Sequence, residues 1–186
     1  MRNDSHKWSP AQAITSFVDT PIDLNVAVIT PIELARQTLI SGANVLSQIN
    51  APLIGWPDIT STESYALCLR RDRVLIVDEV STNDSNRDTG WDDASQQALS
   101  DVSDSYAVFD LSGPQALELL QRGAEISLQT QSRSVMRLLF GLDTMIYRVA
   151  STDRFRIHIA WARQQSLIEH LQMCSRAAES FDLRTL

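Results

Sequence analysis

The second half of the sequence constrains the fold most, because regular elements follow one another there with clear turns between them. SYAVFDL, at 105–111, predicts a strand, and SGPQALELLQRG predicts a helix that begins at Ser112 or Gly113 and ends at Gly123. Three further strands are predicted at 136–140, 143–150 and 154–160. An amphipathic helix is predicted at 161–178, since Leu167, Ile168 and Leu171 recur on one side.

The first half predicts strands and one more helix. IDLNVAVI, at 22–29, predicts a strand that stops at Thr30 and Pro31. We predict a helix at 30–46, because Thr30 is a candidate N-cap, Pro31 suits the first helical position and Glu33 the third. SYALCLRRDRVLIVDEV predicts two strands joined at Arg71–Asp72, the second of them buried on both faces.

This order of elements predicts an α+β fold in which an antiparallel sheet is covered by helices on one face. Residues 1–20 are expected to form an N-terminal arm, and residues 21–186 a single α+β domain. Within that domain, 78–105 is rich in aspartate and is expected to be a mobile, solvated acidic loop, with a short helix at 92–99.

The charge balance argues against a nucleic-acid partner. The sequence has sixteen basic and twenty-three acidic residues, which gives a formal charge of -7, and Lys7 is the only lysine. Binding to phosphates regardless of sequence needs an excess of cations. No apolar run is long enough for a membrane span or a secretory signal, and the two cysteines lie in apolar segments. These features lead us to expect a cytoplasmic protein with no membrane partner.

The usual catalytic motifs are missing from the sequence. It contains no Cys-x-x-Cys pair, no Gly-x-Ser-x-Gly turn, no phosphate-loop lysine and no dinucleotide-binding glycine series. A calcium-like spacing of oxygen ligands at 84–95 has Thr89 where the sharp turn needs glycine, and His170 has no partner at ligand spacing. We therefore predict no catalytic, cofactor-binding or metal-binding residue in this chain.

Two groups of residues are candidates for contact with a ligand or partner. Arg154, Arg156 and His158 alternate with apolar residues in DRFRIHIAW, so they share one strand face that could hold a carboxylate or an acidic surface. The alternative is that this face is simply the solvated side of a half-buried strand. Trp8 and Phe17 in the arm, and Trp56 in the apolar segment 51–56, are the second group, interpreted as partner contacts.

SYAVFDLSGPQALELLQRG, together with MRLLFGLDTMIYRVASTDRFRIHIAWARQQSLIEHLQMC, resembles the γ (gamma) subunit of heterotetrameric sarcosine oxidases, and CLRRDRVLIVDE resembles a preceding strand of that subunit. The resemblance covers about two-thirds of the chain. It implies a fold related to the aminomethyltransferase and folate-binding proteins.

The resemblance also implies a place in a complex with alpha, beta and delta subunits, in which FAD, FMN, NAD, zinc and tetrahydrofolate belong to the partners. Such complexes demethylate sarcosine oxidatively to glycine and pass the one-carbon unit to tetrahydrofolate. The gamma-type chain supplies no catalytic groups there.

Two alternatives remain open at this level. Subunits of N-methylglutamate or dimethylglycine oxidoreductases look similar, so the amine substrate is not determined. A free-standing folate-binding module is the other alternative, in which Arg154, Arg156 and His158 would hold the anionic tail of the folate.

Overall fold

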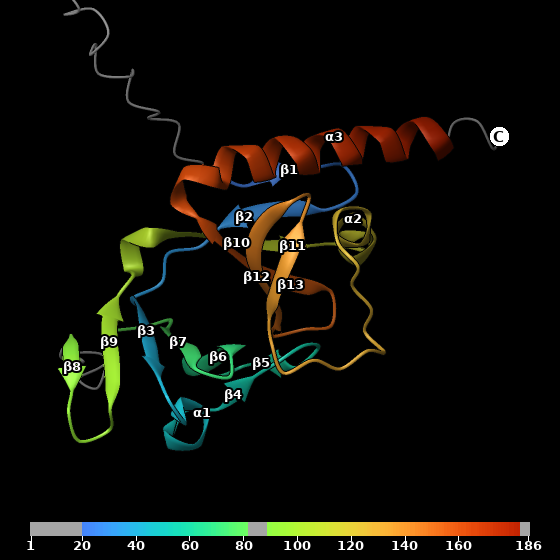
Figure 1. Ribbon diagram of the computed structural model, residues 1–186. Helices are drawn as coiled ribbons and strands as arrows, with labels where there is room; N and C mark the ends of the chain where they lie inside the picture. The colour runs from blue at the N-terminus through green and yellow to red at the C-terminus, as the bar shows by residue number, and fades with distance from the viewer. Residues whose placement is uncertain (1–19, 82–88, 183–186) are drawn as a thin grey trace, which may run out of the picture.

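The chain folds into two β-sheets with helices on the outside (Figure 1). The computed structural model describes residues 20–81 and 89–182. Sheet A consists, in spatial order, of β1 (Ile22–Asp23), β2 (Val28–Pro31), β10 (Tyr106–Ser112), β13 (Arg154–Ala160), β12 (Leu142–Val149) and β11 (Met136–Leu139), and β5 (Ile59–Thr60) also pairs with β12. Sheet B consists of β4 (Leu53–Ile54), β6 (Ser64–Arg70), β7 (Arg73–Asp78), β3 (Arg36–Gly42), β9 (Gln97–Asp101) and β8 (Gly90–Asp92).

The helices cover one face of sheet A, and sheet B covers the other. Figure 1 shows α3 (Gln164–Asp182) running over β1 and β2, with α2 (Ala116–Gly123) beside the same sheet. The short α1 (Val45–Gln48) lies next to β3 and β7. Two 3₁₀ turns, η3 (Ser103–Ser105) and η4 (Trp161–Arg163), lead into β10 and α3.

Three hydrophobic clusters follow from this layering. The largest lies between sheet A and the helices and contains Phe109, Phe155 and Leu171. A second cluster lies between the two sheets, where Tyr65 and Leu67 of sheet B meet Met145 and Tyr147 of sheet A. The third covers the far face of sheet B under α1. Tyr65 and Tyr147 of the middle cluster are hydrogen-bonded to the polar groups described below, so the space between the sheets holds the candidate site.

Most of the predicted elements in the second half are confirmed. The strand at 105–111, the three strands after residue 135 and the final helix correspond to β10, β11, β12, β13 and α3. The two strands around Arg71–Asp72 are also confirmed as β6 and β7, and β7 is buried on both faces. The α+β class holds in coarse form, but the single sheet is wrong, because the strands divide into two sheets.

The helix predicted at 30–46 is wrong. Thr30 and Pro31 end β2, residues 36–42 form the central strand β3, and only α1 is helical. β3 pairs with β7 on one side and β9 on the other, so it lies in the interior of sheet B. The capping pattern at Thr30 was a local signal, and the burial of Thr38 and Ile40 in a sheet outweighs it.

Two further predictions need correction. Residues 22–29 form a hairpin rather than one strand, because Asn25 adopts φ 63° and reverses the chain between β1 and β2. Within 78–105, the helix at 92–99 is replaced by the paired strands β8 and β9, so this part is not an irregular loop. Residues 82–88 of the same stretch lie outside the described residues.

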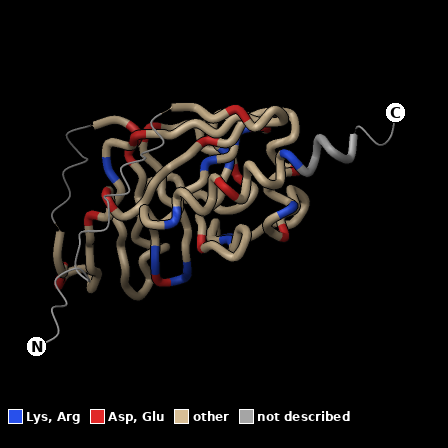
Figure 2. Tube along the Cα trace, turned by 90° about the horizontal axis from the view of Figure 1, so that it is seen from above, with Lys and Arg blue, Asp and Glu red and all other residues tan. Residues whose placement is uncertain are grey.

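Charged residues of both signs are distributed over the chain, as Figure 2 shows for the described positions. No helix among the described residues is long and apolar enough to cross a membrane.

Candidate functional site

The strand β13 presents its polar residues to the space between the two sheets. Phe155, Ile157 and Ile159 pack on the helix side, and the alternate residues Arg156 and His158 face sheet B, so the predicted alternation is confirmed. The prediction that this polar face is a solvated or partner-facing surface is wrong for Arg156 and His158, which are 3% and 0% exposed. Sheet B covers them.

Two arginines on β13 surround one buried carboxylate. Asp110, on the neighbouring strand β10, accepts hydrogen bonds from Arg156 Nε at 2.7 Å and from Arg156 Nη2 at 3.0 Å. Arg154 donates to the same carboxylate from Nε and Nη2 at 2.9 and 2.6 Å. The register of the strands places Asp110 directly opposite Arg156, and this explains the fork-shaped pairing.

Arg156 also reaches across to sheet B. Its Nη1 donates to Glu79 Oε1 at 2.6 Å and to the Tyr65 hydroxyl at 3.1 Å. Asp110 and Glu79 together therefore neutralise the positive charges of the two arginines. Arg154 keeps an accessible edge, with 41% of its side chain exposed.

A row of hydrogen bonds continues from Arg156 through the interior. The hydroxyls of Tyr65 and Tyr147 lie 2.8 Å apart, Tyr147 lies 2.8 Å from His158 Nε2, and His158 Nδ1 lies 2.8 Å from Gln37 Oε1. Gln37 then donates from Nε2 to the Ser103 carbonyl at 3.3 Å. The row crosses from sheet B to sheet A and back, and its members are buried apart from Ser103 at the end.

The hydrogen-bond partners determine which group donates at each step of this row. Because the Gln37 amide donates to Ser103, its Oε1 accepts, so His158 carries its proton on Nδ1. His158 Nε2 then accepts from Tyr147, and Tyr147 accepts from Tyr65. The Tyr65 hydroxyl also donates to Glu79 Oε1 at 3.2 Å, so its proton is shared between that carboxylate and Tyr147. From Tyr147 to Gln37 every donor points the same way along the row, an arrangement in which each bond polarises the next.

The titratable members of the row keep one protonation state across the neutral range. Burial raises the pKa of Tyr65 to about 12 and raises that of Tyr147 well above its ordinary value. Burial, together with the Arg156 charge, lowers the pKa of His158 to about 3. A general acid or base needs a pKa near the working pH, and burial moves the pKa of each of these groups away from that range.

Two cavities lie at the ends of the row. The inner end, at Gln37 and Ser103, lines a cavity of about 540 Å³ beside Tyr106 and Trp161. The outer end, at Glu79, Arg154 and Arg156, lines a cavity of about 160 Å³. Arg154 donates to Asp110 and exposes part of its side chain beside the smaller cavity, whose lining also includes the carboxylates of Glu63 and Glu79. Arg156 and His158 are engaged by internal partners.

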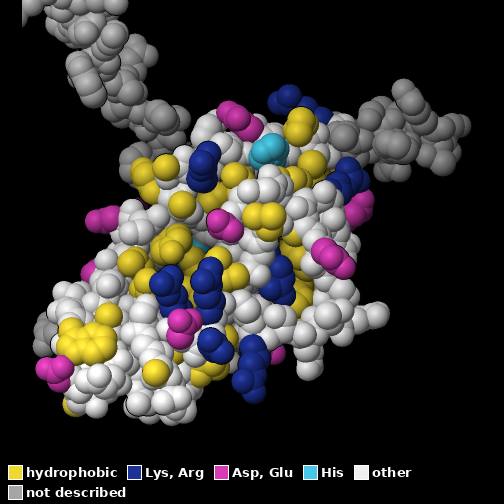
Figure 3. All heavy atoms as spheres, viewed as in Figure 1, with side chains coloured by type: hydrophobic (Ala, Val, Ile, Leu, Met, Phe, Trp, Pro, Cys, Tyr) yellow, Lys and Arg dark blue, Asp and Glu magenta, His cyan; other side chains and the backbone are white. Residues whose placement is uncertain are grey.

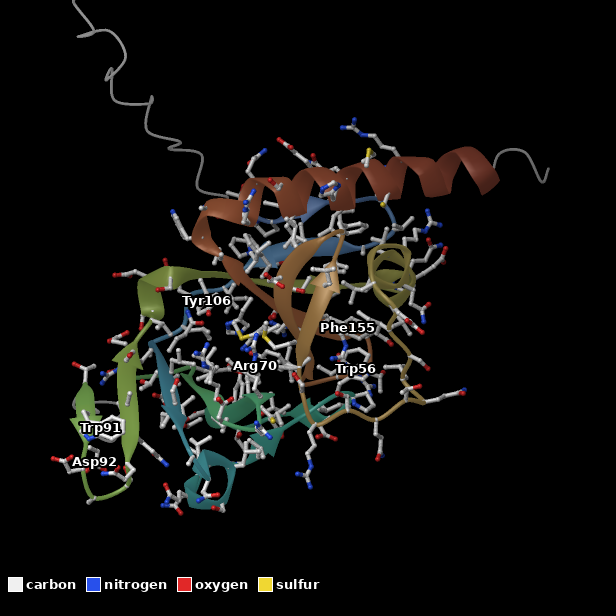
Figure 4. All side chains as sticks on the ribbon, in the orientation of Figure 1. Trp56, Arg70, Trp91, Asp92, Tyr106 and Phe155 are labelled. Atoms are coloured by element: carbon white, nitrogen blue, oxygen red, sulfur yellow. The ribbon has the colours of Figure 1, made fainter. Side chains whose placement is uncertain are left out.

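Of the three aromatic residues predicted as partner contacts, the structure describes Trp56. Trp56 is 2% exposed, so its prediction as a contact surface is wrong. Its indole donates to the Ser127 carbonyl at 2.8 Å and stacks on Phe155, with ring centres 6.2 Å apart (Figure 4). Trp8 and Phe17 lie outside the described residues. His170 stacks on Phe140, and no group of three metal-binding side chains occurs in the part of the chain that the structure describes.

Most of the polar network has no signal in the amino-acid sequence. A buried partner for Asp110 could be predicted, because a carboxylate inside the apolar strand SYAVFDL must be paired when it is buried. Tyr65, Tyr147 and Gln37 have no such signal, since their contacts join strands 82 and 121 positions apart in sequence.

The comparisons with known proteins show a similarity in fold alone. No protein-family model matches the sequence, and no curated protein matches it. Among solved structures, a chain of the heterotetrameric sarcosine oxidase from Corynebacterium sp. U-96, in complex with pyrrole 2-carboxylate, is similar with a TM-score of 0.61 and 13% identity. The alignment covers 86% of this chain and 89% of that chain. The two chains therefore share a fold over nearly their whole lengths.

Proposed function

We propose that this chain is a non-catalytic, gamma-type subunit of a sarcosine oxidase-like hetero-oligomer. The observation that carries the proposal is the shared fold, which extends over 86% of this chain and 89% of a chain from a heterotetrameric sarcosine oxidase. A match of that extent on both sides relates two whole chains rather than one common motif.

The interior of the chain supports a structural role. Its buried charges are paired with one another, and its buried tyrosines and histidine hold one protonation state near neutral pH. A scaffold of this kind can keep two sheets in a fixed relation while partner chains carry the chemistry. In the proposed complex, FAD, FMN, NAD, zinc and tetrahydrofolate belong to the partner subunits.

Purification of the tagged chain from its own host tests the proposal. We expect the full-length chain to elute in size exclusion with other chains as one complex that absorbs as a flavin and oxidises sarcosine. The chain expressed alone should be colourless and inactive. A monomer without partners, or a flavin bound in equal amount to the isolated chain, would contradict the proposal.

The same complex distinguishes the amine substrates. Sarcosine, dimethylglycine and N-methylglutamate are compared by kcat/KM with the purified complex, and the proposal expects sarcosine to be preferred. A preference for either of the other amines would indicate that the chain is a subunit of a related oxidoreductase, with the same structural role.

A further inference from the structure

Exposed arginines gather at the β6–β7 hairpin of sheet B. Arg70 ends β6 and Arg73 begins β7, and the two residues are paired across the hairpin, with Arg71 in the turn between them. All three side chains are exposed. In Figure 3, Lys and Arg side chains gather over the region of β4, β6 and β7, and Figure 4 labels Arg70 in the same part of the view.

A fourth exposed arginine, Arg133, lies beside the same hairpin, although it belongs to the segment before β11. The next residue, Ser134, donates from Oγ to the Leu69 carbonyl at 2.6 Å, one position before Arg70. Burial raises the pKa of the Cys68 thiol, and the positive charge of Arg133 lowers it in part, so this charge acts on the end of β6. Two distant parts of the sequence therefore contribute to one group of arginines.

The positive charges of this group are not neutralised within the chain. None of the four arginines forms an ion pair with a carboxylate among residues 20–81 and 89–182, whereas the arginines of the buried network are all paired. Asp72 lies in the hairpin turn, and the nearby Asp58 accepts a hydrogen bond from the Gly55 N–H at 3.0 Å. The arginines outnumber these two carboxylates, so the surface is locally positive on a chain with a formal charge of -7.

Leucines lie among the arginines. A cavity of about 700 Å³ is lined by Arg71 and Arg73, and a second cavity of about 540 Å³ is lined by Arg133 and Leu53. Leu46 lines both cavities, so they form one continuous surface, and Leu53 is 41% exposed on it. We call this the arginine surface, and it consists of Leu46, Leu53, Arg70, Arg71, Arg73 and Arg133.

The composition of the arginine surface favours a protein partner over a nucleic acid. Arginine is enriched at protein interfaces, where apolar side chains accompany it, and its guanidinium group binds carboxylates in a bidentate geometry. Binding to nucleic-acid phosphates regardless of sequence depends on an excess of cations, which this acidic chain lacks. Salt limits the attraction between exposed charges to about 10 Å, so the acidic remainder of the chain does not oppose a partner that contacts this surface alone.

We propose that the arginine surface docks an acidic segment of a partner protein. Carboxylates of the segment pair with the four arginines, and its apolar side chains contact Leu46 and Leu53. The inference goes beyond the proposed function, because the isolated chain should recognise an acidic peptide whichever complex the partner belongs to.

Fluorescence anisotropy of a labelled peptide made of glutamate and leucine, titrated with the full-length chain, tests the inference. We expect saturable binding at a salt concentration of about 0.05 M, weakened about tenfold at about 0.5 M. The same peptide with glutamine in place of glutamate should show no saturable binding. A labelled single-stranded oligothymidylate, which carries phosphates instead of carboxylates, should bind at least about fivefold more weakly than the glutamate peptide.

Matched variants locate the binding on the arginine surface. Arg70→Gln/Arg73→Gln should weaken peptide binding about fivefold, and Arg133→Gln about threefold, because each exposed ion pair contributes modestly. Arg163→Gln/Arg176→Gln removes two exposed arginines from η4 and α3 and changes the net charge equally, so it should leave binding within about twofold. Circular dichroism and thermal unfolding check that the variants remain folded.

The inference is overturned by any of three results. These are the absence of saturable binding of the glutamate peptide, an equal loss of affinity in the two double variants, and tighter binding of the oligothymidylate than of the peptide. None of them bears on co-purification with flavin-containing subunits, so failure here leaves the proposed function standing. A chain that purifies without partners would contradict the proposed function and leave peptide binding to be measured as before.

Discussion

At the scale of single residues, Asp110 is the centre of the buried charge network. Its side chain is 2% exposed and accepts hydrogen bonds from both Arg154 and Arg156. A guanidinium buried as deeply as that of Arg156 is tolerated only because its charge is paired and its N–H groups are bonded. Removing the carboxylate therefore leaves a buried cation with only the half-exposed Glu79 beside it.

Replacement of the buried carboxylate should destabilise the protein strongly. Asp110→Asn is expected to lower the free energy of unfolding by about 3 kcal/mol, because Arg156 loses its main counter-charge. Urea denaturation measures the change. Glu118→Gln, which removes the solvent-exposed pair with Arg122 on α2, is the control and should cost below about 1 kcal/mol. Equal effects of the two substitutions would contradict the assigned role of Asp110.

His158 should make stability depend on pH in the acidic range. An unfolded histidine has a pKa near 6.5, whereas burial lowers the native pKa to about 3, so between these values only the unfolded chain takes up the proton. Stability is therefore fully present above pH 6.5 and falls as the pH falls toward 3. From pH 7.5 to 5, wild type should lose about 2 kcal/mol more than His158→Gln.

The substitution keeps a donor and an acceptor at position 158 but removes the titration. Urea denaturation of both proteins at the two pH values measures the difference, and the carboxylates shared by both proteins cancel. Identical pH dependence in wild type and variant would show that His158 titrates normally in the native state.

At the scale of elements, α2 and α3 meet the turn between β11 and β12 at one close contact. Gly123, the last residue of α2, accepts a hydrogen bond from the Phe140 backbone N–H at 2.8 Å. A Cβ atom at position 123 would lie 2.5 Å from Cε1 of the Phe140 ring, and that ring stacks on His170 of α3. The absence of a side chain at Gly123 thus allows three elements to pack together.

Filling this space should destabilise the packing, and the loss should depend on Phe140. Gly123→Ala is expected to lower the free energy of unfolding by about 2 kcal/mol, because the ring must leave its position. In Gly123→Ala/Phe140→Leu the loss should be smaller than the sum of the single losses by about 1 kcal/mol. Urea denaturation of the four proteins completes the cycle, and additive losses would count against the clash.

At the scale of the whole molecule, the polar row joins the two sheets into one unit. Tyr65 and Gln37 belong to sheet B, whereas Tyr147, His158 and Arg156 belong to sheet A. Opening the sheets apart would expose the middle cluster and leave buried polar groups without partners. Separate unfolding of either sheet is therefore unfavourable.

Native-state hydrogen exchange should show this coupling. Amides in β6 and β7 of sheet B are expected to exchange with the same free energy of opening, within about 0.5 kcal/mol, as amides in β10 and β13 of sheet A. Exchange of sheet B at a clearly lower free energy, while sheet A stays protected, would contradict a single cooperative unit.

The sequence by itself determined the local elements of the second half and the two faces of β13. Period-two alternation separates Arg156 and His158 from Phe155 and Ile157 whatever packs against them, because successive side chains in a strand point to opposite faces. Gly123 likewise marks the end of α2, which is confirmed, but the start predicted at Ser112 or Gly113 is wrong, because Ser112 ends β10 and α2 begins at Ala116. These features depend on neighbours in the chain, which a sequence displays directly.

Only the tertiary structure decided what each face meets. The same alternation is compatible with solvent or with a second sheet, and sheet B covers Arg156 because β3, β6 and β7 fold against β12 and β13. The local sequence of β3 predicts a helix, whereas its strand character arises from pairing with β7 and β9 rather than from local propensity. Contacts between residues as distant as Gln37 and His158 come from chain topology, and no local pattern in the sequence records them.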